Sequence, residues 1–270
     1  MTDLRALMDV AVGVAREAGD ASLHGWRSGP VESRNKSRLD IVTDVDVRTE
    51  RLIISALRRT FPDHEILGEE SGAVGVSGSD WEWVIDPIDG TVNFAAGLPE
   101  YSVSLGLRQR KLRVLGVVYA PALGEIYSAA RGHGARCGAC PIEPSRTREL
   151  RDAVVAVMLA PHFEDHLIQR TVELISRLAA VCRGVRIQVS QALELAWVAS
   201  GRLDATVSLW RSAEGISAAA GEVLVEEAGG RLSGANGRGL GDPGAYGFVA
   251  STPGIYHSLL EAMSTGDAEP

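Results

Sequence analysis

Residues 83–91 read Trp-Val-Ile-Asp-Pro-Ile-Asp-Gly-Thr, an apolar run that leads into a turn at proline. The turn presents the carboxylates of Asp86 and Asp89 and the hydroxyl of Thr91 close together in the chain. A strand end can hold such short side chains about one metal ion apart, and carboxylate oxygens are the ligands that Mg²⁺ and Mn²⁺ prefer. Gly90 lets the backbone approach an anion closely. The stretch therefore indicates a metal and phosphate site, and an Asx turn without a bound ion is the alternative.

Two further acidic segments precede this stretch. Residues 68–70, Gly-Glu-Glu, follow the short apolar run 65–67, which indicates the end of a strand. Residues 40–46, Asp-Ile-Val-Thr-Asp-Val-Asp, open a predicted helix that ends at about residue 61. Any one threonine or aspartate of that segment could instead be a simple helix cap.

The succession VTDVD, GEE and DPIDGT resembles the inositol monophosphatase family of Mg²⁺-dependent, Li⁺-sensitive phosphomonoesterases. The wider superfamily includes fructose-1,6-bisphosphatase and the 3′-nucleotidases that act on adenosine bisphosphates. The resemblance covers nearly the whole chain, and beyond the acidic motifs it rests on residues 116–121, 132–135, 193–205, 227–230 and 249–251. It implies a layered α-β-α-β-α sandwich in a single domain of residues 1–270. The metal-binding motifs would lie in a lobe of about residues 1–150, and residues 151–270 would form the substrate side.

The hydrophobic pattern differs between the two halves of the chain. The first half predicts an α+β arrangement, with antiparallel strands near residues 102–107, 113–119 and 125–129. Residues 71–80 are small, and they predict a flexible connection at the edge of a lid. From about residue 150 the pattern alternates as in an α/β fold. The predicted strands are 154–159, 185–189 and 203–209, and the predicted helices are 164–181, 191–200 and 217–228.

The 270-residue chain has the composition of a soluble globular protein, with 45% hydrophobic residues and a mean hydropathy of +0.04. Its net charge of −8 and pI near 5.3 argue against a nucleic-acid polymer as partner. We find no secretory segment and no apolar run long enough to cross a membrane, so we expect a cytoplasmic enzyme without a membrane partner. A small phosphorylated substrate is the expected ligand, and the resemblance implies a homodimer.

The resemblance also implies a set of Mg²⁺ ligands, three carboxylates and one backbone carbonyl: Glu69, Asp86, Asp89 and Ile88. Two or three Mg²⁺ ions per site are expected, which would activate a water and stabilise the leaving oxygen. Thr91, hydrogen-bonded to Asp46, would orient the water and take part in removing its proton. The amides of Gly90 and Thr91 would bind the phosphate oxygens. Lys36 lies in the N-terminal loop, where a basic residue often approaches the site, and a solvated lysine is the alternative.

The chain departs from the family in its C-terminal signature. The family has Trp-Asp, a run of small residues and then Glu-Ala-Gly-Gly, but counting back from Glu227 the first two positions are Ile216 and Ser217. The missing aspartate is a ligand of the second metal. That metal could be lost, Ser217 or a water could complete its coordination, or Glu214 could reach into the position from a segment slightly longer than usual.

The expected substrate pocket differs as well. Residues 189–192 read Val-Ser-Gln-Ala where the family has Gly-Ser-Ala-Ala, and the acidic residue that contacts a polyol falls near Ser208. Ser190 and Arg186 are candidate substrate-binding residues, and Arg186 and Arg211 could meet a second anionic group. These differences predict an alcohol other than inositol.

Three functions are compatible with this sequence. The first is Mg²⁺-dependent hydrolysis of a small phosphate monoester, of a cyclitol, a sugar or a related alcohol. The second is a bisphosphate nucleotidase or sugar bisphosphatase of the same superfamily. The third is a degenerate, non-catalytic member that binds phosphorylated ligands, because the usual aspartate is Ser217.

Overall fold

The computed structural model describes the chain over residues 3–29, 31–36, 40–160, 163–212 and 215–264. Its α-helices are α1 (Leu4–Arg27), α2 (Asp44–Thr60), α3 (Thr91–Ala96), α4 (Asp165–Val181), α5 (Gln191–Ala199), α6 (Ala218–Ala228) and α7 (Tyr256–Ser264), and its short 3₁₀ helices are η1 (Leu150–Asp152) and η2 (Pro253–Ile255). An eight-stranded sheet has the order β10 (Cys140–Pro141), β9 (Ala135–Cys137), β8 (Glu125–Ala130), β7 (Leu112–Ala120), β6 (Ser102–Gln109), β5 (Trp81–Asp89), β3 (Glu65–Gly68) and β4 (Gly72–Gly75). A five-stranded sheet has the order β12 (Gly184–Arg186), β11 (Val154–Val157), β13 (Ala205–Ser208), β15 (Phe248–Ser251) and β14 (Arg231–Ser233). A separate hairpin pairs β1 (Ser33–Asn35) with β2 (Ile41–Thr43).

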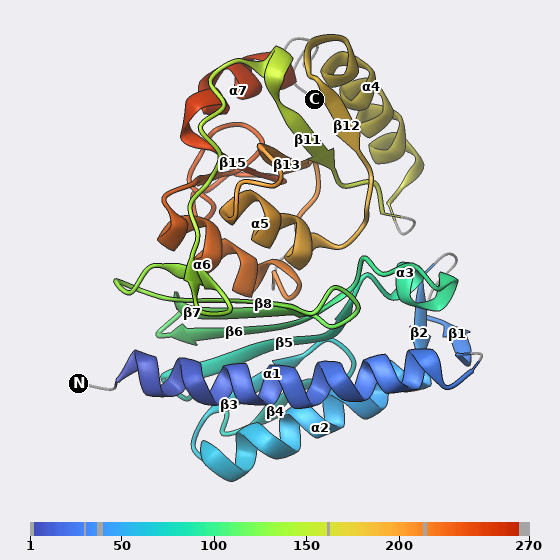
Figure 1. The fold of residues 1–270 in the computed structure, drawn as a ribbon, viewed down its shortest axis with the longest axis vertical. Helices are drawn as coiled ribbons and strands as arrows, with labels where there is room; N and C mark the ends of the chain where they lie inside the picture. The colour runs from blue at the N-terminus through green and yellow to red at the C-terminus, as the bar shows by residue number, and fades with distance from the viewer. Residues whose placement is uncertain (1–2, 30, 37–39, 161–162, 213–214, 265–270) are drawn as a thin grey trace.

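Helices and sheets alternate in five layers (Figure 1). Helices α1 and α2 pack against each other and against the eight-stranded sheet. Helices α5 and α6 pack on that sheet too and also contact strands of the five-stranded sheet. Helices α4 and α7 form the outermost layer beyond the second sheet. The predicted α-β-α-β-α sandwich is confirmed.

The first helical layer forms where the sequence places its caps and its apolar stripe. Asp3 caps α1 by accepting hydrogen bonds from the amides of Arg5 and Ala6. Thr43 and Asp46 form a reciprocal capping box at the start of α2, and this helix ends at Phe61 as predicted. The apolar side of α1 then packs into a core shared with α2 and the large sheet.

Strand β5 carries the acidic turn and lies near the middle of the large sheet. It pairs in parallel with β3 and antiparallel with β6, and the register with β6 shifts between Asp86 and Asp89. This irregularity turns the end of the strand away from regular pairing, as β-bulges beside functional sites commonly do. The prediction for residues 71–80 is wrong in part, because residues 72–75 form the edge strand β4, paired antiparallel with β3. An edge strand needs only backbone pairing on one side, so small side chains suffice there.

The second half alternates as predicted, with shorter strands. Strand β11 pairs in parallel with both β12 and β13, while β15 pairs antiparallel with β13 and β14. The predicted strand 185–189 ends at Arg186, and Val189 has a φ of 55°, which a regular strand does not allow. The polypeptide turns at that point and enters α5.

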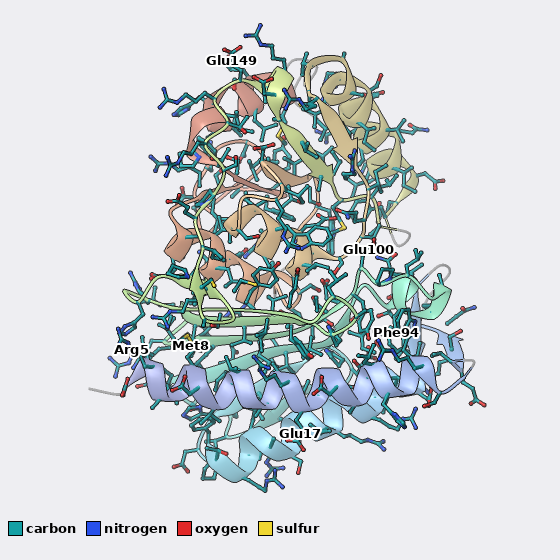
Figure 2. All side chains as sticks on the ribbon, in the orientation of Figure 1. Arg5, Met8, Glu17, Phe94, Glu100 and Glu149 are labelled. Carbon is teal, nitrogen blue, oxygen red and sulfur yellow. The ribbon has the colours of Figure 1, made fainter. Side chains whose placement is uncertain are left out.

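The site lies at the end of the large sheet from which α3 extends. Figure 2 shows Phe94 of α3 and Glu100 at this end of the molecule, far from Arg5 at the start of α1. Asn93 joins the two halves here, since its side-chain amide donates to the carbonyls of Glu100 and Gln188 at 2.8 and 2.6 Å. Within the described part of the chain, none of the helices combines the length and the apolar character that a membrane crossing requires.

Candidate metal and phosphate site

A cavity of about 420 Å³ opens between the two halves of the chain. Its described lining includes the following residues predicted for the site: Glu69, Asp86, Ile88, Asp89, Gly90, Thr91 and Ser217. They come from the ends of β3 and β5, the start of α3 and the residue before α6. The structure thus brings together side chains from three separate acidic or small-residue motifs.

One wall of the cavity, here called the acidic wall, is formed by Glu69, Asp86 and Asp89. Asp86 lies at its centre and is almost fully buried. Its Oδ1 accepts a hydrogen bond of 3.1 Å from the amide of Ile88. Burial raises the pKa of Asp86 well above its ordinary value, and the neighbouring carboxylates of Glu69 and Asp89 raise it further. A hydrogen bond with the Ser217 side chain acts in the opposite direction. Such mutual repulsion is relieved when a divalent cation binds between the carboxylates.

Asp89 points toward the N-terminus of α5. Its carboxylate accepts hydrogen bonds from the Ser190 hydroxyl at 2.6 Å and from the amides of Gln191 and Ala192 at 3.0 and 2.9 Å. Burial raises the pKa of Asp89 to about 6, although these hydrogen bonds lower it. Ser190, predicted to contact substrate, is fully buried and supports Asp89 from behind the cavity wall.

Thr91 and Asp46 form the predicted pair. The Thr91 hydroxyl lies 3.1 Å from Asp46 Oδ1 and 3.0 Å from the carbonyl oxygen of Ile88. Asp46 is held in turn by the capping box, in which the Thr43 amide donates to its Oδ2 at 2.9 Å. Burial raises the pKa of Asp46, while the hydrogen bonds from Thr43 and Thr91 lower it. An ordered, desolvated carboxylate behind a hydroxyl is suited to accepting a proton.

Gly90 provides the sharp turn between β5 and α3. Its φ is 94°, and a Cβ atom there would lie 3.0 Å from the carbonyl oxygen of Glu100. Both the backbone conformation and the lack of space therefore require glycine. The turn leads directly into the amide of Thr91 at the cavity wall.

Lys36 contacts the acidic wall from the N-terminal segment. Its Nζ lies 2.9 Å from Glu69 Oε1 and also forms an ion pair with Glu70. Burial alone would lower the pKa of Lys36, but the two carboxylates raise it above its ordinary value. Burial likewise raises the pKa of Glu70 to about 7, against the effect of Lys36. A cation bound at Glu69 would therefore compete with this ammonium group.

The donor set fits one divalent cation better than two. Glu69, Asp86 and Ile88 line the cavity, and their carboxylate and carbonyl oxygens are hard donors that suit Mg²⁺. A second position would depend on Asp89, whose oxygens are occupied by α5, and on the neutral Ser217. Over the described residues, no group of three or more His, Cys, Asp and Glu side chains is already arranged around a common metal position. The carboxylates are not arranged in this way because Asp89 is hydrogen-bonded to α5 and Glu69 is paired with Lys36.

Neither of the two predicted arginines, Arg186 and Arg211, lines the cavity. Arg186 is exposed at the end of the edge strand β12, and its guanidinium donates to the carbonyl of Val185. Arg211 lies 2.9 Å from the buried carboxylate of Glu222, which also pairs with Arg113. Its charge is thus neutralised inside the protein. Glu214, the third candidate for the second metal position, lies outside the described residues.

Sequence reasoning missed the apolar part of the lining and one carboxylate. The missed residues are Asp40, Val92, Met158, Ala160, Phe163, Trp210 and Ser212. Several of them directly follow the carboxyl ends of β11 and β13. Ligands bind at that end of parallel strands in α/β sheets, so residues after each predicted strand could have been flagged.

Comparisons with known proteins found similar sequences and similar structures. The model of the inositol monophosphatase family matches residues 3–266. A relative from Pasteurella multocida, named Nus factor SuhB, is 35% identical over 261 residues, or 96% of each chain. Inositol monophosphatase 1 of Solanum lycopersicum is 31% identical and covers 98% of this chain and 97% of its own. The crystal structure of the extragenic suppressor protein suhB from Bartonella henselae superposes with a TM-score of 0.90 at 30% identity, over 97% of this chain and all of the other.

Proposed function

The chain belongs to the inositol monophosphatase family, and on that premise we propose that it hydrolyses a small phosphate monoester in a Mg²⁺-dependent reaction. The observation that supports the proposal is the shared cavity, in which Glu69, Asp86 and the Ile88 carbonyl adjoin a threonine hydroxyl held against Asp46. The substrate is the phosphate monoester of a small alcohol, with a specificity different from that of inositol phosphatases.

The residues divide the work as follows. The chemistry supplied by Mg²⁺ bound at Glu69, Asp86 and the Ile88 carbonyl is activation of a water and stabilisation of phosphoryl charge. The Thr91 hydroxyl orients the attacking water, and Oδ1 of Asp46 accepts the proton through it. The backbone amide of Thr91 holds a phosphate oxygen, which fixes the ester for attack.

The test is phosphate release from a panel of sugar, cyclitol, amino-alcohol and nucleotide monophosphates, with and without Mg²⁺. We expect release that requires Mg²⁺ and that falls by at least about 100-fold in Asp86→Asn, since a ligand contributes at least as much as its supporting groups. The matched control is Asp80→Asn, which removes an exposed carboxylate paired with Arg110 and should leave the rate unchanged. Release that persists in EDTA, or that Asp86→Asn does not alter, would contradict the proposal.

A second candidate is a non-catalytic role as a phospholigand-binding protein. It is favoured by Ser217 at the second-metal position and by relatives that are named Nus factors rather than phosphatases. Phosphate release separates the two, because the donor set fits one Mg²⁺ per chain in either case. The non-catalytic protein would bind inorganic phosphate in a calorimetric titration with Mg²⁺ and would release no phosphate from any ester.

A bisphosphate substrate receives less support. Among the described residues that line the cavity there is no lysine or arginine to meet a second phosphate, and Arg211 is paired with Glu222. A homodimer is our proposal for the assembly, supported by family membership. We also propose that the chain has no nucleic-acid or membrane partner; the net charge of −8 supports this, whereas relatives named Nus factors weigh against the nucleic-acid part.

A further inference from the structure

The cavity has an acidic wall and, next to it, an apolar wall. The apolar wall is formed by Val92, Met158, Ala160, Phe163, Val189, Trp210 and Ile216. These residues come from α3, from the segments that follow β11, β12 and β13, and from the approach to α6. A phosphate held at the Thr91 amide, beside the acidic wall, would therefore direct its ester oxygen and alcohol toward a carbon-rich surface.

Two aromatic rings dominate this wall. The ring centroids of Phe163 and Trp210 lie 5.8 Å apart with their planes inclined by 48°. Phe163 is buried in a small cluster with Met158, whereas 38% of Trp210 is exposed. Because Trp210 lines the cavity and is partly exposed, its indole offers a stacking surface to a bound molecule.

Two hydroxyl groups close to the rings, those of Ser208 and Ser212, are already engaged within the protein. The Ser208 hydroxyl donates to the Trp210 carbonyl at 2.7 Å and accepts from the Trp210 amide at 3.1 Å. Ser212 Oγ accepts from the amide of Gly215 at 2.8 Å. These contacts fix the main chain of Trp210 and use part of the hydrogen-bonding capacity of both hydroxyls. Polyol hydroxyls placed directly against the two rings would face carbon atoms and lose water, which is unfavourable.

We infer that the alcohol of the substrate carries an aromatic ring, which packs against Trp210 and Phe163 while the phosphate faces Asp86 and Gly90. The inference rests on the proposed function and names its substrate class. A cavity of about 420 Å³ holds a phosphate together with one ring. The thioether of Met158 adds a further favourable contact to an aromatic ring.

The experiment compares three esters on the full chain with Mg²⁺: 2-phenylethyl phosphate, 2-cyclohexylethyl phosphate and myo-inositol 1-phosphate. The first two share their chain length and differ only in the flatness and π-character of the ring. We expect kcat/KM for the phenylethyl ester to exceed that for the inositol ester by at least about tenfold, and that for the cyclohexyl ester by severalfold. Equal or better turnover of the inositol or the cyclohexyl ester would overturn the inference.

A variant at Trp210 tests whether this wall supplies the preference. Trp210→Ala should lower kcat/KM for the phenylethyl ester about tenfold and leave ethyl phosphate within about twofold, because only the first reaches the indole. Trp210→Phe should retain most of the preference. An equal loss on both esters would show that the indole only supports the fold, and the inference would fail.

Binding separates this inference from the proposed function. Calorimetry with the phosphonate analogues of the phenylethyl and cyclohexylethyl esters measures ring preference without turnover. If no ester is hydrolysed, the proposed function fails, and tighter binding of the phenyl phosphonate in the wild type than in Trp210→Ala would still support the aromatic pocket. Equal binding of the two phosphonates would overturn it.

Discussion

The side chain at position 217 determines whether a further negative charge lies beside Asp86. Ser217 lines the cavity, and its side chain forms a hydrogen bond that lowers the pKa of Asp86. Its carbonyl is held by the Ser104 hydroxyl at 3.5 Å, so the start of α6 is tied to the large sheet. A hydroxyl at this position stabilises the ionised form of Asp86 without adding another negative charge.

Ser217→Asp should lower the stability of the metal-free protein and raise its affinity for Mg²⁺. A third carboxylate beside Asp86 and Asp89 raises the repulsion when no cation is bound and adds a hard ligand when one is. We expect a lower Tm in EDTA, a larger Mg²⁺-induced rise in Tm, and Mg²⁺ affinity increased by at least about tenfold. Calorimetry and thermal unfolding measure both effects.

Ser217→Asn is the matched control for this change. It has nearly the size of aspartate but no charge, so it should neither lower the Tm in EDTA to the same extent nor raise Mg²⁺ affinity comparably. If aspartate and asparagine behave alike, charge at position 217 is not what limits the second metal.

Among the secondary-structure elements, helix α5 has two roles. Its first amides hold Asp89, and it also carries Glu194, which is fully buried and accepts a 2.7 Å hydrogen bond from Thr206. Burial, with a smaller contribution from the charge of Asp89, raises the pKa of Glu194 from 4.5 to about 7, although the hydrogen bond from Thr206 lowers it. The folded protein therefore retains a proton on Glu194 that the unfolded chain loses at lower pH.

Glu194→Gln should flatten the dependence of stability on pH. With a folded pKa above the unfolded one, the stabilising contribution of Glu194 is complete below about pH 4.5 and is lost as the pH rises to about 7. Glutamine cannot ionise, so the variant should gain stability relative to wild type across this interval, by up to about 3 kcal/mol. Urea unfolding in EDTA at a series of pH values measures the difference.

The exposed carboxylate of Glu173 on α4 provides the control for the pH series. Glu173→Gln removes a charge of the same type from the surface, and its stability difference from wild type should stay near zero over the same range. A constant difference for Glu194→Gln, independent of pH, would mean that this group does not titrate in the interval.

The elements that could be predicted are those whose signals are local. The capping box of α2, the apolar stripe of α1 and the strand that leads into Asp86 are each written within a few adjacent residues. The same holds for the acidic cavity wall, since its carboxylates lie at strand ends that pair in one sheet. Local chemistry and family resemblance therefore anticipated the layers and the residues that share the acidic side of the cavity.

What could not be predicted depends on segments distant in the chain. Strand β4 forms because it pairs with the edge of β3. Ser190, at the N-terminus of α5, donates a hydrogen bond to Asp89, which is distant in the chain. The contact between the rings of Phe163 and Trp210 joins loops that follow different strands of the second sheet. No periodicity within either loop indicates the other, so the apolar wall was visible only in three dimensions.

At the scale of the whole molecule, two glycines form the joint between the halves. Gly106 and Gly116 are directly paired across β6 and β7, beneath α6. A Cβ atom on Gly116 would lie 2.1 Å from the carbonyl oxygen of Ala220, and one on Gly106 would lie 2.8 Å from Cβ of Ala219. The helix that begins beside Ser217 can approach the large sheet only because both positions lack a side chain.

Gly116→Ala should therefore weaken the fold and the site together. Overpacking of this kind costs about 1–3 kcal/mol, and the displaced α6 would carry Ser217 away from Asp86. We expect a lower urea midpoint and reduced Mg²⁺ affinity of the molecules that remain folded. Gly13→Ala is the control, because Gly13 is exposed on α1 and a Cβ atom there would have no neighbour within 4 Å, so alanine should stabilise by about 0.5–1 kcal/mol. If the Gly116→Ala protein is as stable as wild type, α6 can move off the sheet without a loss of stability. The second metal position would then be set by position 217 alone.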